Sequence, residues 1–77
     1  MNKIRRKELA KAISLIEEAM NIISECRDEE QDAFDNLPEG IQDSERGDQM
    51  QEYIDMMDEA YDNLEDKMDV ISEIVEG

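Results

Sequence analysis

Residues 50–76, MQEYIDMMDEAYDNLEDKMDVISEIVE, contain two interleaved patterns that each advance in steps of three and four residues. Side chains with this spacing lie on one face of an α-helix, because a helical turn contains 3.6 residues. The apolar pattern consists of Met50, Ile54, Met57, Tyr61, Leu64, Met68, Ile71 and Val75. The acidic pattern consists of Glu52, Asp55, Glu59, Asp62, Asp66, Asp69, Glu73 and Glu76. We therefore predict one long helix with an apolar seam and, on another side, the eight carboxylates that we call the acidic edge.

A second apolar seam of the same spacing precedes this region and predicts another helix, over about residues 3–36. Its members are Leu9, Ile13, Ile16, Met20 and Ile23, and the spacing resumes at Phe34 and Leu37. Between these two parts Arg27 and Glu30 occupy seam positions, where a helix pair normally places aliphatic side chains. Either they pair with one another as i, i+3 neighbours, or the seam opens to solvent near the turn.

Residues 37–47 form the predicted turn between the two helices. Pro38 suits the second position of a type I turn, and it disfavours helical geometry in the residue before it. Asp43-Ser44 or Asp48 could cap the next helix, and Asp48 with Gln51 resembles a capping box. With Asp48 as the cap, the second helix covers residues 48–76. A connection of about ten residues returns it antiparallel to the first.

The predicted fold is therefore all-α: one domain over residues 1–77, formed as an antiparallel, coiled-coil-like two-helix hairpin. Packing the two seams together pairs Ile23 with Tyr61 and Ile13 with Ile71, a register in which facing residue numbers sum to about 84. This packing also brings five cations near the start of the chain to the acids near its end. The cations are Lys3, Arg5, Arg6, Lys7 and Lys11, and the acids are Asp69, Glu73 and Glu76.

Each predicted helix has further apolar residues beside its seam, and we call the two sets together the apolar face. The large members are Leu15 and Ile22 on the first helix, and Tyr53, Met56, Val70 and Ile74 on the second. One neighbouring helix covers only a narrow stripe, so a hairpin cannot bury both sets. A second copy would cover them and give a homodimer that forms a four-helix bundle. The alternative is a groove on a target protein.

The charge balance restricts the class of partner. The 77 residues include 23 acidic and eight basic side chains, for a net charge of −15. This charge opposes direct binding to nucleic acid or to an anionic membrane and favours a protein with a basic surface. Of the eleven charged side chains from Glu52 to Glu76 only Lys67 is basic, whereas a merely solvated helix usually alternates charges of both signs.

Residues typical of catalytic and metal sites are scarce. The chain has no histidine, no nucleophile beside a base and no glycine-rich phosphate loop, so we expect no enzyme activity and no cofactor. Residues 43–48 lack the alternating oxygen ligands of a calcium loop, and we expect no metal site. The single cysteine, Cys26, is expected to be a small core residue rather than a reactive thiol. A lone cysteine, the lack of a signal peptide and the lack of a long apolar run predict a cytoplasmic protein.

The stretch FDNLPEGIQDSERGDQM, residues 34–50, resembles the turn region of small acidic helical proteins of phages and prophages. The start Arg5-Arg6-Lys7-Glu8 and the segment EAYDNLED, residues 59–66, are similar as well. The family has no assigned binding residues. The resemblance implies a phage context, and therefore the cytoplasm of a bacterial host. Short, very acidic phage proteins are often inhibitors of host defence nucleases, and some imitate DNA.

Three functional hypotheses follow. In the first, the protein blocks a basic, nucleic-acid-binding site of a bacterial defence protein. Its phosphate surrogates would be Asp55, Glu59, Asp62, Asp66, Asp69 and Glu73. In the second, it is a self-associating scaffold or adaptor that acts through the apolar face, and the acids only keep it soluble. In the third, it regulates transcription through another protein.

Overall fold

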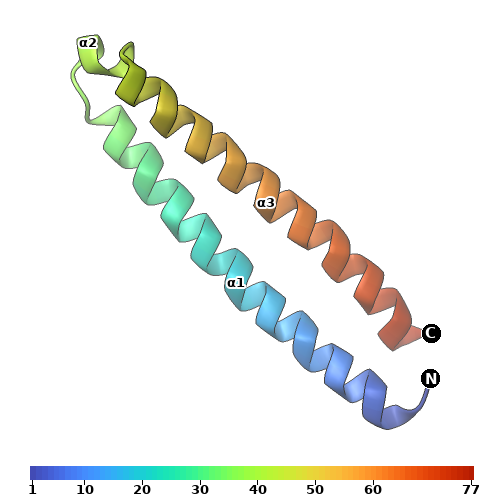
Figure 1. Cartoon of the computed structure of the whole chain (residues 1–77). Helices are drawn as coiled ribbons and strands as arrows, with labels where there is room; N and C mark the ends of the chain where they lie inside the picture. Colours follow the sequence, from blue (N-terminus) through green and yellow to red (C-terminus); the bar gives the residue numbers. More distant parts are fainter.

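The computed structural model describes all 77 residues and contains only helices (Figure 1). In chain order they are α1 (Lys3–Asp35), α2 (Glu39–Gln42) and α3 (Glu45–Glu76). In Figure 1, α1 and α3 lie side by side and run in opposite directions, so both termini are at one end and α2 is at the other. The molecule measures 58 × 15 × 12 Å. The all-α class is confirmed, and this shape fits the predicted helical hairpin.

The core lies along the contact between α1 and α3. Ile54 is completely buried and Met20 is 5% exposed. The other predicted seam residues of both helices are half-buried. Ile23 and Tyr61 line one cavity, and Arg27 contacts Asp58 across the interface. These contacts confirm the predicted register, in which residue numbers facing each other sum to about 84.

Side chains outside the two seams determine where α1 begins and ends. Asn2 caps the helix, because its Oδ1 accepts a hydrogen bond of 2.9 Å from the Arg5 backbone amide. The helix ends at Asp35, one residue before the predicted Asn36. At that end the Gln42 side-chain amide donates to the carbonyl oxygen of Phe34 at 3.0 Å. Gln42 therefore satisfies a terminal carbonyl of α1 from a different helix.

The connection between the long helices differs from the predicted type I turn. Pro38 has a ψ of 146°, whereas the second residue of a type I turn requires a ψ near −30°. Pro38 instead precedes α2, and its carbonyl oxygen accepts from the amides of Ile41 at 2.8 Å and Gln42 at 3.0 Å. The type I assignment was therefore wrong, because Pro38 initiates a short helix instead of entering a turn.

Helix α3 begins at Glu45, three residues earlier than the predicted start at Asp48. Ser44 is the residue before the helix, and its hydroxyl donates to the carbonyl oxygen of Ile41 instead of capping α3. Asp48 lies inside the first turn, so the capping box proposed for it was wrong. Gly47 is buried there, and an added Cβ would clash with the carbonyl oxygen of Gln42. The missing side chain lets the end of α2 approach α3 closely.

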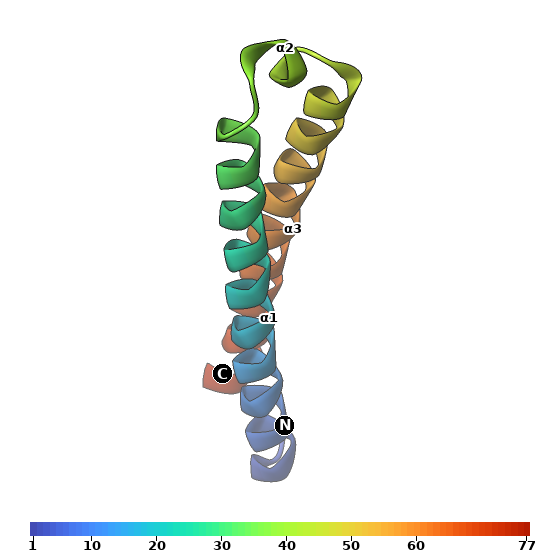
Figure 2. The same cartoon turned by 90° about the vertical axis from the view of Figure 1, so that its left-hand side faces the viewer.

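The protein is a thin rod, and Figure 2 shows α1 and α3 crossing at a shallow angle. Its radius of gyration is 17.4 Å, against about 11–12 Å for a compact domain of this length. Its accessible surface is 5884 Å², against about 4,900 Å² for a compact protein of this mass. No helix combines the length and apolar character that crossing a membrane requires.

Candidate functional site

The acidic edge lies along α3, on the side of the helix away from the seam. All eight of its carboxylates are exposed. Glu52 and Glu76 are 24 residues apart, which corresponds to about 36 Å of helix, with one carboxylate about every 5 Å. No cation lies within 4.0 Å of any of them, since both ion pairs of the structure belong to Arg27. One hydrogen bond reaches the acidic edge, from the Gln51 side chain to Asp55 at 3.4 Å.

Helix α1 adds acidic side chains but does not extend the edge itself. Its exposed carboxylates in the part that packs against residues 52–67 of α3 are Glu17, Glu18, Glu25, Asp28, Glu29 and Asp32. Duplex DNA carries one phosphate charge per about 1.7 Å of its axis, so the acidic edge alone has a lower charge density than DNA. The carboxylates of α1 add to the negative charge of the rod as a whole.

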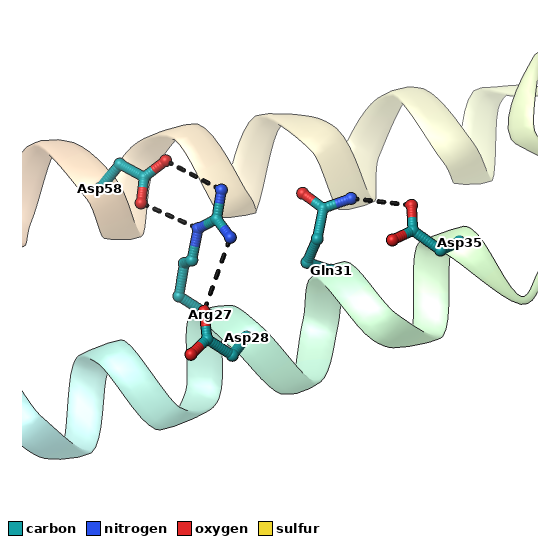
Figure 3. A network of polar contacts seen from close by, with 5 residues as sticks. All are labelled: Arg27, Asp28, Gln31, Asp35 and Asp58. Carbon is teal, nitrogen blue, oxygen red and sulfur yellow. Dashed lines mark hydrogen bonds and ion pairs between the residues drawn. The ribbon is translucent and has the colours of Figure 1, made fainter.

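Arg27 connects the two long helices (Figure 3). Its Nε donates to Asp58 Oδ1 at 2.9 Å, and a terminal nitrogen donates to Oδ2 at 3.5 Å. Its other terminal nitrogen lies 3.6 Å from Asp28 Oδ1. The hydrogen bonds to Asp58 raise the pKa of the guanidinium above its ordinary value, and the negative charges of both carboxylates add to this effect. Of the two alternatives for this part of the seam, the pairing of Arg27 with Glu30 does not form, because Asp58 offers a two-oxygen partner across the interface.

The basic start of α1 lies at the same end of the molecule as the acidic end of α3 (Figure 1). None of the five cations comes within 4.0 Å of a carboxylate. Arg6 is half-buried, and its Nε is buried without a hydrogen-bond partner. Attraction between the two ends therefore acts over a distance and forms no ion pair within one copy.

The apolar face occupies one side of the hairpin. An open groove of about 470 Å³ lies between Ile23 and Glu30 of α1 and Tyr53, Met56, Met57 and Ala60 of α3. An adjoining hollow is lined by Cys26, Glu29, Glu30 and Met57. Because Tyr53 and Met56 share this region with Cys26, the apolar residues of both helices lie on the same side. Cys26 is exposed, so its expected place in the core was wrong.

The large side chains of the apolar face are all accessible to solvent. Their exposed fractions are 57% for Leu15, 61% for Ile22, 47% for Tyr53, 55% for Met56, 51% for Val70 and 42% for Ile74. Ile4, at the start of α1, is 74% exposed and follows the same helical spacing through Glu8 and Ala12 to Leu15. The apolar face thus extends from the termini to the groove near α2.

Sequence reasoning missed two features that the helical periodicity contains. The apolar residues beside each seam are displaced from it in the same rotational sense, and in an antiparallel pair this displacement places them on one common side. The register likewise places Arg27 opposite Met57 and Asp58. The common side follows from the two seams and their relative direction alone, whereas the choice of Asp58 as the partner of Arg27 also depends on the distance between the helices.

The structure groups no three or more Asp, Glu or Cys side chains in a way that could hold a metal ion. Comparison of the chain with protein-family models, with curated proteins and with solved structures found no significant match. The resemblance of residues 34–50 to phage and prophage proteins is neither supported nor contradicted by these comparisons.

Proposed function

We propose that this chain is a non-enzymatic acidic binding protein whose acidic edge occupies a basic, nucleic-acid-binding site on another protein. The observation that carries this proposal is the row of eight exposed carboxylates on α3, none of which has a cation within 4.0 Å. Like charges at i, i+4 spacing destabilise a helix by a few tenths of a kcal/mol per pair. A basic partner would offset this repulsion, because its cations would attract the carboxylates of the acidic edge.

The shape of the molecule supports the same partner class. The acidic edge lies along one long helix, so its carboxylates form a straight row about 36 Å long. A partner that holds nucleic acid has a complementary row of lysines and arginines along its groove. In the phage setting that the sequence resemblance implies, this partner is a bacterial defence protein, and its blocked groove would no longer bind DNA.

The test is capture from a bacterial lysate on the immobilised protein, at low and at high ionic strength. We expect nucleic-acid-binding proteins to be retained at low salt, to be lost at high salt and to be released by added duplex DNA. A triple variant with Asp55→Asn, Asp62→Asn and Asp66→Asn should lose capture. Its control removes three charges from α1 instead, with Glu17→Gln, Glu18→Gln and Glu25→Gln, and should keep it. Capture that is indifferent to salt and to DNA would contradict the proposal.

A second candidate function rests on the apolar face. Six large side chains that are 42–61% exposed on one side of a two-helix rod are typical of a surface that another chain covers. In this alternative the protein is a self-associating scaffold or adaptor, and two copies form a four-helix bundle. Leu15→Glu or Met56→Glu would then abolish its activity, while reversal of charge at Asp62 and Asp66 would leave it intact.

A further inference from the structure

We propose that a second copy covers the apolar face in an antiparallel arrangement with twofold symmetry. The first turns of α1 of each copy then lie over the groove at Glu30, Tyr53 and Met56 of the other copy. This arrangement rests on the self-association proposed above and adds to it a defined orientation and a defined contact.

The amount of exposed surface fits an occupant of the same size as the chain. The protein exposes roughly 1,000 Å² more surface than a compact protein of its mass. A standard stable interface buries about 800 Å² on each partner. The apolar face runs the length of the rod from Ile4 to Tyr53, so a partner of equal length covers it, whereas a short peptide leaves most of it exposed.

The distribution of charge selects the orientation. Residues 1–11 contain five cations and one carboxylate, while residues 25–52 contain eleven carboxylates and two arginines. These two segments lie at opposite ends of the 58 Å rod. If both copies had α2 at the same end, the two acidic ends would meet and repel each other. The antiparallel arrangement places the basic start of α1 of each copy on the acidic end of the other copy.

The groove contains a carboxylate without a cation nearby, and this arrangement would supply one. Glu30 is half-buried among Tyr53, Met56 and Met57, and no cation lies within 4.0 Å of it. A partially buried carboxylate gains from a nearby cation. On the partner, Ile4 and Arg5 are adjacent and exposed. Ile4 continues the helical spacing of the apolar face, and Arg5 lies between that face and the seam, four residues before Leu9. The partner's Ile4 would cover the apolar floor of the groove, and the partner's Arg5 would pair with Glu30.

The arrangement makes a geometric prediction. The contact of Ile4 with the groove at Glu30 makes facing residue numbers of the two α1 helices sum to about 34. The helices therefore cross between Leu15 and Ala19, and Glu8 of one copy lies close to Cys26 of the other. The two copies of Cys26 lie roughly 30 Å apart, from the helical rise and their distance from the crossing point. The acidic edge stays on the outside of the dimer, on both copies, and remains free for a basic partner.

A thiol cross-link tests the orientation. The exposed native Cys26 and an introduced Glu8→Cys would be treated with a short bis-maleimide, with the mass measured beforehand by light scattering at low and high salt. We expect twice the chain mass of 9.0 kDa and a covalent dimer when both thiols are present. The native chain and Glu8→Cys combined with Cys26→Ser should each give no cross-linked product. Circular dichroism would show that all variants remain helical.

The other outcomes separate the possibilities. A cross-link between Cys26 of one copy and Cys26 of the other would overturn the antiparallel orientation and keep self-association. A dimer in which no combination of thiols reacts would do the same. A monomer at every concentration would overturn both and leave the function of the acidic edge untouched. An independent test is charge exchange: Arg5→Glu should weaken dimerisation on the order of tenfold, and adding Glu30→Lys should restore it. If the double variant were weaker than Arg5→Glu alone, the contact would be disproved.

Discussion

At the scale of single residues, Arg27 shows what periodicity can and cannot predict. The seam spacing placed it correctly between the helices, because that position follows from 3.6 residues per turn. Its partner depends on which side chains beside the opposite seam can reach it, and Asp58 lies just beside the seam of α3. A choice between Glu30 and Asp58 thus required the distance between the helices, which no sequence pattern contains.

We expect Asp58→Asn to lower the free energy of unfolding, because it removes the charge that Arg27 contacts at 2.9 Å. The effect should be small, since the Asp58 side chain is 51% exposed. Asp62→Asn, one turn along the same helix, is the matched control. It removes a carboxylate that faces other carboxylates and should leave stability unchanged or raise it slightly. Urea unfolding measures both, and equal losses in the two variants would argue against a stabilising ion pair.

Ile54 should be the most sensitive apolar position, because it is completely buried and the core contains few other buried side chains. Ile54→Ala is expected to cost about 2–4 kcal/mol of unfolding free energy through lost burial and a new cavity. Ile74→Ala, at a position 42% exposed, should cost less than about 1 kcal/mol when the chain is dilute. Thermal or urea unfolding of the two variants checks the ranking. Similar losses at both positions would mean that the core is not centred on Ile54.

At the scale of elements, the two long helices were predictable and α2 was not. Each long helix repeats its pattern over many turns, whereas α2 has four residues and therefore no repeat. Several polar residues could also have started α3, and the choice was made by packing: the buried Gly47 lets the backbone of Gln42 approach. The only sign of a close backbone approach in a sequence is a glycine, and glycines occur for many other reasons.

Gly47→Ala should therefore destabilise the protein by about 1–3 kcal/mol, because its Cβ would overlap the carbonyl oxygen of Gln42 and move α2. Gly40→Ala is the matched control. It lies inside α2 with nothing within 4 Å of an added Cβ, and should stabilise by about 0.5–1 kcal/mol through better helix propensity. Chemical unfolding of both variants decides the point. If Gly47→Ala were neutral, the end of α2 would not be held against α3 in this way.

At the scale of the whole molecule, the arrangement of surfaces follows from the sequence once the helices are antiparallel. The spacing predicts that α3 exposes its acids and that each helix has apolar residues beside its seam, and the structure confirms both. The sequence does not identify what binds these surfaces, because a surface determines only the charge and shape that a partner must have. The two partner classes proposed above, a basic protein for the acidic edge and a second copy for the apolar face, therefore rest on complementarity alone.

The last prediction concerns the conflict between stability and binding on the acidic edge. Asp62→Lys combined with Asp66→Lys should raise the unfolding free energy, because it replaces like-charge neighbours with opposite charges along α3. The same variant should no longer capture the basic partner that we propose. Glu18→Lys combined with Glu25→Lys changes the net charge by the same amount on α1 and should keep the partner. Unfolding and capture would be measured on both double variants. Only the Asp62 and Asp66 variant should gain stability and lose capture, since a surface selected for binding retains repulsion that selection for folding alone would remove.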